Sequence, residues 1–170
     1  LSMIFVTVGT HEQQFNRLIE CVDNLKKNCV IQEDVIIQTG YSTYIPNYCM
    51  WKKFFPYQEI IKMVQDARIV ITHGGPASFI MPLQIGKIPI VVPRRHEFNE
   101  HVNNHQINFL RNMNNRMRML VLVEDINTLG DIITSYSQIV DDLRSGMTTN
   151  NTKFCDEFGK LIVELFKEDR

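Results

Sequence analysis

Short runs of apolar, mostly β-branched residues recur along this chain, and stretches with helical spacing separate them. The runs are Ile4 to Val8, Asp34 to Gln38, Ile69 to Thr72, Ile88 to Val92 and Met119 to Val123, with a weaker one from Cys49 to Phe54. Continuous apolar runs of this length are typical of strands that are buried on both faces. Their alternation with helices predicts an α/β fold, in which helices cover both faces of a parallel sheet.

Helical spacing of apolar residues is clearest after the first run and at the end of the chain. Phe15, Leu18, Ile19, Val22 and Leu25 fall on one stripe, and so do Ile60, Ile61 and Val64. A terminal stripe comprises Phe154, Phe158, Leu161, Ile162, Leu165 and Phe166. It indicates an amphipathic helix that closes the domain's own core or, alternatively, contributes to a partner interface.

The composition fits one globular domain, which we expect to span residues 3–170. The length of 170 residues is enough for a single core, and Leu1 and Ser2 before Met3 have the look of a tag remnant. A net charge of −1 gives no global field for binding nucleic acid. No apolar stretch approaches the ~20 residues that cross a bilayer. Scattered cysteines (Cys21, Cys29, Cys49 and Cys155) indicate reduced thiols in a cytosolic protein with no metal site.

Glycine-containing turns follow the predicted strands, at the end of the sheet where open α/β proteins bind ligands. They are Gly9-Thr10-His11, Thr39-Gly40-Tyr41 and His73-Gly74-Gly75-Pro76-Ala77-Ser78. Glycine allows a ligand to approach the backbone closely, and Pro76 suits the first turn of a helix, whose N-terminus favours a phosphate. Neither G-x-G-x-x-G nor a G-K-[ST] motif occurs here, which weighs against a dinucleotide dehydrogenase or an ATPase.

Polar residues are dense after Pro93. Arginines, histidines, carboxylates and amides alternate there: Arg94, Arg95, His96, Glu97, Asn99, Glu100, His101, Asn103, Asn104, His105 and Gln106. So many hydrogen-bonding side chains at one end of a sheet indicate a site for a hydroxylated ligand, although a solvated surface explains any single one of them equally well.

Three ordered motifs resemble the C-terminal domain of family 28 glycosyltransferases. They are the 73–78 turn, the segment Gly86 to Pro93 and Glu100-His101-Val102-Asn103-Asn104-His105-Gln106. Val6-Thr7-Val8-Gly9-Thr10 fits the same family. The sequence is similar to small bacterial capsule and exopolysaccharide subunits that work in pairs, and to the soluble subunit of a two-component N-acetylglucosamine transferase that acts on dolichol-linked diphosphate-N-acetylglucosamine.

The resemblance implies a Rossmann-like half of a GT-B fold, the half that binds a UDP-sugar without a cofactor or metal. It places the uracil against Phe54 and Phe55, and the diphosphate at Gly74, Gly75 and Ser78. The other residues that it assigns to the UDP-sugar are Gly9, Thr10, His73, Arg94, His105 and Gln106, with Gln106 as the better reader of sugar hydroxyls.

The resemblance assigns fewer residues to catalysis than to UDP-sugar binding. Many relatives have a ribose-binding glutamate where this chain has Met81, so Glu100, or more weakly Glu97, is a substitute candidate. A base must take the acceptor proton, and positive charge or dipoles must stabilise the leaving diphosphate. We expect His11 to reach the reacting centre and Arg94 or Arg95 to assist, while two-domain relatives take the base from the acceptor half.

The resulting hypothesis is a subunit that transfers a hexose, galactose or N-acetylglucosamine, from a UDP-sugar to a lipid-linked saccharide in surface polysaccharide synthesis. Such a chain would need a separate membrane-anchored, acceptor-binding partner, which would hold it at the inner face of the membrane. The alternatives are a non-catalytic nucleotide-sugar-binding or regulatory subunit and, less favoured, a binding module for another nucleotide.

Overall fold

The computed structural model describes residues 2–147, 159–160 and 163. Six parallel strands form one sheet in the order β3-β2-β1-β4-β5-β6. The strands are β1 (Met3–Thr7), β2 (Asp34–Gln38), β3 (Met50–Lys52), β4 (Ile69–His73), β5 (Ile90–Val92) and β6 (Val121–Leu122). The α/β prediction is confirmed, and every predicted apolar run overlaps a strand.

A helix follows each strand except β2, which leads directly to β3, and two helices follow β6. They are α1 (Asn16–Lys27), α2 (Tyr57–Asp66), α3 (Pro76–Gln84), α4 (His105–Met117), α5 (Leu129–Thr134) and α6 (Tyr136–Met147), with the short 3-10 turns η1 (His96–Phe98) and η2 (Ile126–Thr128). Pro76 occupies the first turn of α3, as predicted. The six apolar residues of the predicted terminal helix lie outside the described residues.

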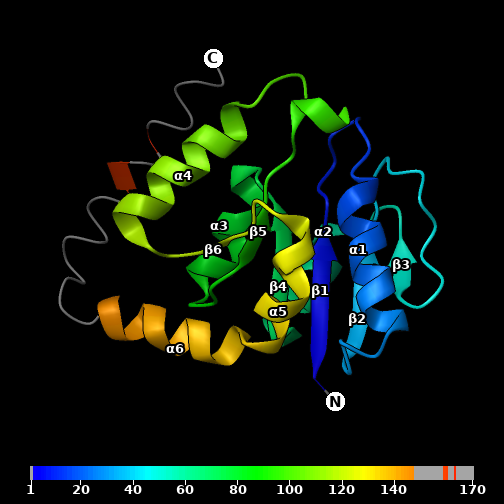
Figure 1. The fold of residues 1–170 in the computed structure, drawn as a ribbon, viewed down its shortest axis with the longest axis horizontal. Helices are drawn as coiled ribbons and strands as arrows, with labels where there is room; N and C mark the ends of the chain where they lie inside the picture. Colours follow the sequence, from blue (N-terminus) through cyan, green and yellow to red (C-terminus); the bar gives the residue numbers. More distant parts are fainter. Residues whose placement is uncertain (1, 148–158, 161–162, 164–170) are drawn as a thin grey trace.

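The sheet is buried on both faces because side chains alternate along each strand. Ile4 and Val6 of β1 pack into a core with α1, α5 and α6, whereas Phe5 points to the opposite core beside α2. A third cluster joins α3 and α4 over β5. Figure 1 shows α1 and α5 on the near side of the sheet.

The strand order reverses at the centre of the sheet. From β1 the chain continues outward to β2 and β3, and from β4 it continues in the other direction to β5 and β6. The loops that leave β1 and β4 therefore diverge, and such a point at the carboxyl ends of parallel strands is where open α/β sheets bind ligands.

A buried carboxylate joins α1 to the connection between β2 and β3. Asp23 is fully buried, and its two oxygens accept hydrogen bonds from the Tyr44 hydroxyl and from the backbone amides of Asn47, Tyr48 and Cys49 at 2.8–3.1 Å. Burial by itself raises the pKa of this carboxyl, but the amide and hydroxyl donors outweigh it and lower the pKa overall. Ionised Asp23 therefore fixes this loop to the helix.

Replacing Asp23 with Asn turns one accepting oxygen into an NH₂ that faces donors. We expect a loss of roughly 2–4 kcal/mol in the free energy of unfolding at neutral pH, measured by urea denaturation. Because the folded pKa is depressed, the wild-type advantage is present above the unfolded pKa of about 3.9 and is lost as the pH falls through the folded value. Asp34→Asn, at an exposed position of β2, is the control and should change stability little. Equal losses in the two variants would contradict this role.

Candidate functional site

A pocket of about 530 Å³ opens where the loops after β1 and β4 diverge. Its walls come from both loops, from the start of α3, from α2 and from the first turn of α4. The lining residues are Thr7, Gly9, Thr10, His11, Gln38, Tyr57, Ile60, Val64, His73, Gly75, Pro76, Ala77, Ser78, Met81 and Gln106. Of the residues predicted from the sequence, the structure brings together Gly9, Thr10, His11, His73, Gly75, Ser78 and Gln106.

The imidazole ring of His73 lies between two glycine backbones. A Cβ at Gly9 would stand 2.3 Å from His73 Nε2, and one at Gly75 would stand 2.2 Å from His73 Cε1. Both distances are far inside van der Waals contact, so neither position accepts a side chain without displacing the ring. Gly9 also has a φ of +73°, a conformation that suits glycine. The Gly-Thr-His and His-Gly-Gly motifs therefore meet around this one side chain.

Hydrogen bonds fix the protonation of His73. The Gly75 amide donates to Nδ1 at 3.0 Å, so the neutral ring has its proton on Nε2, which lies 3.0 Å from Ser78 Oγ. Burial, followed by the field of Arg94 and the other histidines, lowers the pKa of His73 to about 3. A neutral His73 thus donates to Ser78 Oγ, and the Ser78 hydroxyl proton remains available for a ligand.

The first turn of α3 is the other source of hydrogen-bond donors in the pocket. Gly75 precedes the helix, but its amide is already bonded to His73, and Pro76 has no N–H. Contrary to the sequence hypothesis, the Gly75 amide is therefore not free to bind a diphosphate. Ala77 and the Ser78 hydroxyl line the pocket at the positive end of the helix, which is suited to an anion.

Gly74 allows helix α4 to pack closely against the end of β4. A Cβ there would stand 2.9 Å from Gln106 Oε1 and 2.8 Å from Leu110 Cδ1, so the glycine lets the first turns of α4 approach β4. Gln106 lines the pocket, and its Oε1 is buried without a hydrogen-bond partner among the described residues. Because this oxygen is buried against Gly74, it can accept from a ligand hydroxyl only when the Gln106 amide turns toward the pocket.

Two pocket residues that sequence reasoning did not select lie at the ends of β1 and β2. Gln38 Nε2 donates to Thr7 Oγ1 at 3.1 Å, and the same oxygen accepts the Gly9 amide. Gln38 Oε1 accepts the amide of Phe55. Their signal in the sequence is a buried polar residue at the carboxyl end of an otherwise apolar strand.

The two phenylalanines assigned to uracil do not line the pocket. Phe55 is half-buried and meets Phe5 edge to face with ring centroids 6.4 Å apart, whereas exposed Phe54 packs against Tyr41 at 5.3 Å. Tyr57 is the aromatic residue that lines the pocket from this side.

Arg94 lies beneath the β1–α1 loop instead of in the pocket. It is fully buried, and its guanidinium donates to the backbone oxygens of Val8, Gln13, Gln14 and Glu100 at 2.7–3.1 Å. Burial lowers the pKa of Arg94 to about 10, so it stays charged at neutral pH. Arg94 shapes the loop that carries Gly9 and His11, and it does not reach a diphosphate.

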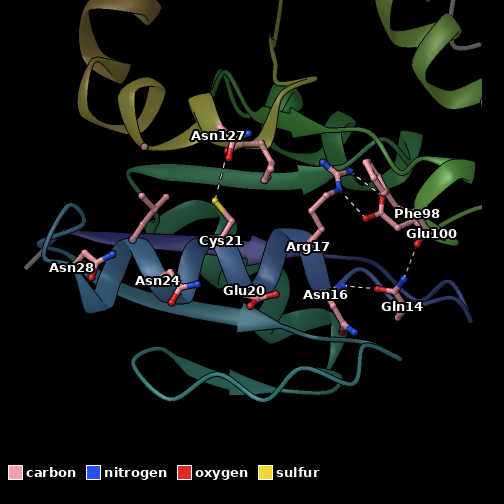
Figure 2. Close-up of a pocket in the computed structure, with 13 residues that line it drawn as sticks. Gln14, Asn16, Arg17, Glu20, Cys21, Asn24, Asn28, Phe98, Glu100 and Asn127 are labelled. Atoms are coloured by element: carbon pink, nitrogen blue, oxygen red, sulfur yellow. Dashed lines mark hydrogen bonds and ion pairs between the residues drawn. The ribbon is translucent and has the colours of Figure 1, made fainter.

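The Glu100 side chain lies away from the pocket, against Arg17 of α1. Its carboxylate accepts two hydrogen bonds of 2.9 Å from Arg17 and one from the Arg95 amide, and it is almost fully buried. Figure 2 shows this ion pair at one end of a separate groove of about 650 Å³ along α1. Cys21, in the same groove, is kept protonated because burial raises its pKa to about 11. The structure therefore does not bring Glu100 to the pocket.

His11 is the one titratable pocket residue besides His73 and Tyr57. Its Nδ1 accepts the Gln13 amide at 3.2 Å, which leaves the proton of the neutral ring on Nε2. Burial, Arg94 and His101, whose ring centroid is 4.9 Å away, lower the pKa of His11. His105 is exposed at the start of α4 and does not line the pocket, and Arg95 and Glu97 pair with each other outside it.

The lining residues include no carboxylate, lysine or arginine. The pocket thus offers hydroxyls, amides, neutral imidazoles and a helix N-terminus to a ligand. No group of three potential metal ligands, and no helix able to span a membrane, occurs among the residues that the structure describes.

The protonation state of His73 is directly measurable. With a pKa near 3, the ring should stay neutral, with its proton on Nε2, from about pH 8 down to about pH 5. Two-dimensional ¹H–¹⁵N spectra of the imidazole nitrogens report the tautomer, and His73→Gln assigns the signal. A His73 ring that titrates near pH 6.5, or that carries its proton on Nδ1, would be incompatible with this geometry.

Comparison with known proteins agrees with the fold. Residues 3–153 match the sequence model of the glycosyltransferase family 28 C-terminal domain. The UDP-N-acetylglucosamine transferase subunit ALG13 of Homo sapiens is 32% identical over 178 residues, which cover 99% of this chain but 15% of that protein. The chain thus spans a small part of that relative's length.

Two solved glycosyltransferases have the same fold at low identity. The glycotransferase of kitacinnamycin superposes with a TM-score of 0.54 at 16% identity, covering 96% of this chain and 38% of that one. SnogD from Streptomyces nogalater gives a TM-score of 0.50 at 15% identity, covering 84% and 40%. The fold is therefore the Rossmann-like half of a GT-B glycosyltransferase. From the match over residues 3–153, we conclude that the chain belongs to the glycosyltransferase family 28 C-terminal domain family.

Proposed function

We propose that this chain binds a UDP-hexose in the pocket between the β1 and β4 loops and serves in its transfer to a lipid-linked saccharide. N-acetylglucosamine is the favoured sugar because the human relative is a UDP-N-acetylglucosamine transferase subunit, and galactose is the second candidate. The observation that carries the proposal is the Ser78 hydroxyl, which His73 holds with its proton free at the positive end of α3.

In this proposal the diphosphate lies at the start of α3, where the Ser78 hydroxyl and the helix dipole face it. The sugar lies toward Gln106, whose Oε1 has no partner among the described residues and accepts from a sugar hydroxyl once the amide turns into the pocket. Transfer forms a bond from the acceptor oxygen to the anomeric carbon and breaks the bond from that carbon to the diphosphate. UDP leaves with the electron pair, and its charge is stabilised by these dipoles instead of by a cation.

The acceptor proton requires a base, and the pocket lining supplies few. It contains no carboxylate, and neutral His11 uses Nδ1 to accept the Gln13 amide while Nε2 holds a proton. His11 is thus set as a donor toward the ligand. This arrangement supports a base from outside the pocket, and in the proposal a separate acceptor-binding, membrane-associated subunit of a surface polysaccharide or lipid-linked glycan pathway supplies it. It also favours the alternative, in which this chain binds the nucleotide sugar and its partner performs all the chemistry.

Two substitutions distinguish the residues that bind the nucleotide from those that bind the sugar. Ser78→Ala should weaken UDP and UDP-N-acetylglucosamine alike, by about tenfold or more, because a hydrogen bond to a charged phosphate is lost. Gln106→Ala should weaken the UDP-sugar while leaving UDP unchanged. Isothermal titration calorimetry measures all four affinities.

Matched controls remove a hydroxyl or an amide side chain at exposed positions. Ser137→Ala on α6 and Asn108→Ala, two residues beyond Gln106, should keep both affinities. A folded Ser78→Ala protein with wild-type UDP affinity would remove the diphosphate assignment. Equal weakening of UDP and UDP-sugar by Gln106→Ala would remove the sugar assignment.

The two-subunit proposal predicts little transfer by this chain alone. Transfer of labelled N-acetylglucosamine to a lipid-linked acceptor should appear when an acceptor-binding partner is added, and Gln106→Ala should reduce the activity of the pair. Full activity of the isolated chain, unchanged by the partner, contradicts the two-subunit reading. A fully active pair that contains Gln106→Ala contradicts a donor site in this chain.

A further inference from the structure

The side-chain hydroxyl of Thr7 has both of its lone pairs occupied and its proton unused. Thr7 is the last residue of β1, only 6% of its surface is exposed, and it lines the pocket between the β1 and β4 loops. Its Oγ1 accepts two N–H donors, the Gly9 amide and Gln38 Nε2, each at 3.1 Å. Because a hydroxyl oxygen has two lone pairs and one proton, Thr7 can form a further hydrogen bond only as a donor.

The orientation of the Gln38 amide fixes this assignment. The Phe55 amide donates to Gln38 Oε1 at 3.0 Å, so the NH₂ end of the same side chain faces Thr7. Neither that NH₂ group nor the Gly9 amide can accept the hydroxyl proton. Thr7 Oγ1 has no other hydrogen-bond partner among the residues that the structure describes. Its proton is therefore left for an acceptor inside the pocket.

The neighbouring threonine on β4 provides a contrast. Thr7 is in register with Gln38 of β2 on one side and with Thr72 of β4 on the other, in three adjacent strands at the centre of the sheet (Figure 1). Thr72 is fully buried, does not line the pocket and donates its hydroxyl proton to His73 O at 3.0 Å. Buried polar groups are almost always hydrogen-bonded, so the unused proton of Thr7 indicates a missing ligand.

A chain of contacts links Thr7 to Ser78. The amide of Gly9 donates to Thr7, and a Cβ at Gly9 would stand 2.3 Å from His73 Nε2. The same nitrogen lies 3.0 Å from Ser78 Oγ, whose proton is also available. The end of β1 and the start of α3 thus each present one hydroxyl proton to the pocket, and both hydroxyls are held by hydrogen bonds from the protein.

We propose that Thr7 is a second hydroxyl donor to the diphosphate of the nucleotide sugar. An ionised diphosphate has only acceptor oxygens, which match two hydroxyls that are both set as donors. The edge of uracil is a poorer match, because it combines carbonyl acceptors with an N–H donor. Thr7 takes this role only if the proposed function is right, since it needs a diphosphate in the pocket. It extends the diphosphate site from the start of α3 to the end of β1.

Two substitutions at Thr7 separate the hydroxyl from the rest of the side chain. Thr7→Ser keeps the oxygen and its proton, and it should bind UDP and pyrophosphate within about threefold of the wild type. Thr7→Val removes the proton and should weaken both ligands about tenfold, because a hydrogen bond to a charged group is lost. Uridine, which has no diphosphate, should bind Thr7→Val and the wild type equally. Calorimetry measures UDP, and NMR titration measures the two weaker ligands.

The matched control is Thr39→Val. Thr39 is a buried threonine that follows β2, donates to Lys52 O at 3.4 Å and does not line the pocket. Its replacement should leave the affinities for UDP, pyrophosphate and uridine unchanged.

A second measurement uses the wild-type protein and does not depend on the folding of any variant. In NMR spectra of protein with ¹³C-labelled threonine, the hydroxyl proton of Thr7 should become slow to exchange and resolved when pyrophosphate binds. The absence of this signal in Thr7→Val assigns it.

Wild-type affinity of folded Thr7→Val for pyrophosphate would overturn the role of Thr7. Equal weakening of uridine and pyrophosphate would also overturn it, because that result indicates a distorted loop and not a lost donor. So would a Thr7→Ser protein as weak as Thr7→Val, or a Thr7 hydroxyl that stays in rapid exchange in the wild-type complex. Wild-type protein that binds neither UDP nor pyrophosphate would instead refute the proposed function, and the role of Thr7 with it.

Discussion

The ring of His73 touches the backbones of both loops that form the pocket between β1 and β4. Gly9 on one side and Gly75 on the other leave no room for a side chain, so the two loops can approach only through glycine. The same ring accepts the Gly75 amide and donates to Ser78. Its neutrality, which follows from burial and the field of Arg94, keeps both hydrogen bonds in place. The orientation of the Ser78 hydroxyl therefore depends on one uncharged imidazole.

Buried polar groups below the pocket hold its loops in position. Arg94 gathers four backbone oxygens beneath the β1–α1 loop, and Gln38 ties β1 to the residues before α2. Because the Arg94 guanidinium is hydrogen-bonded to backbone oxygens, it affects the pocket only indirectly. Its positive charge lowers the pKa values of the histidines, and its hydrogen bonds set the conformation of the β1–α1 loop. A ligand then meets neutral donors and a helix N-terminus, which suit the diphosphate of the proposed UDP-sugar.

The sequence predicted the sheet and the loops of the site because both depend on local patterns. Apolar runs located the strands, and glycine turns located the pocket. Local patterns cannot predict which charged residues form ion pairs across the fold. Arg17 and Glu100 are 83 positions apart, and their ion pair holds Glu100 away from the pocket. Three of the four backbone partners of Arg94 likewise lie in a loop 80 or more positions away. Thr7 and Gln38 were missed because each is one polar residue in an apolar strand.

A crystal structure of the chain with UDP tests the central claim most directly. The account predicts diphosphate oxygens within hydrogen-bond distance of Ser78 Oγ at the start of α3, with the His73 ring still between Gly9 and Gly75. UDP bound elsewhere, such as the groove along α1 that contains Arg17, or a His73 ring turned away from Ser78, would contradict it.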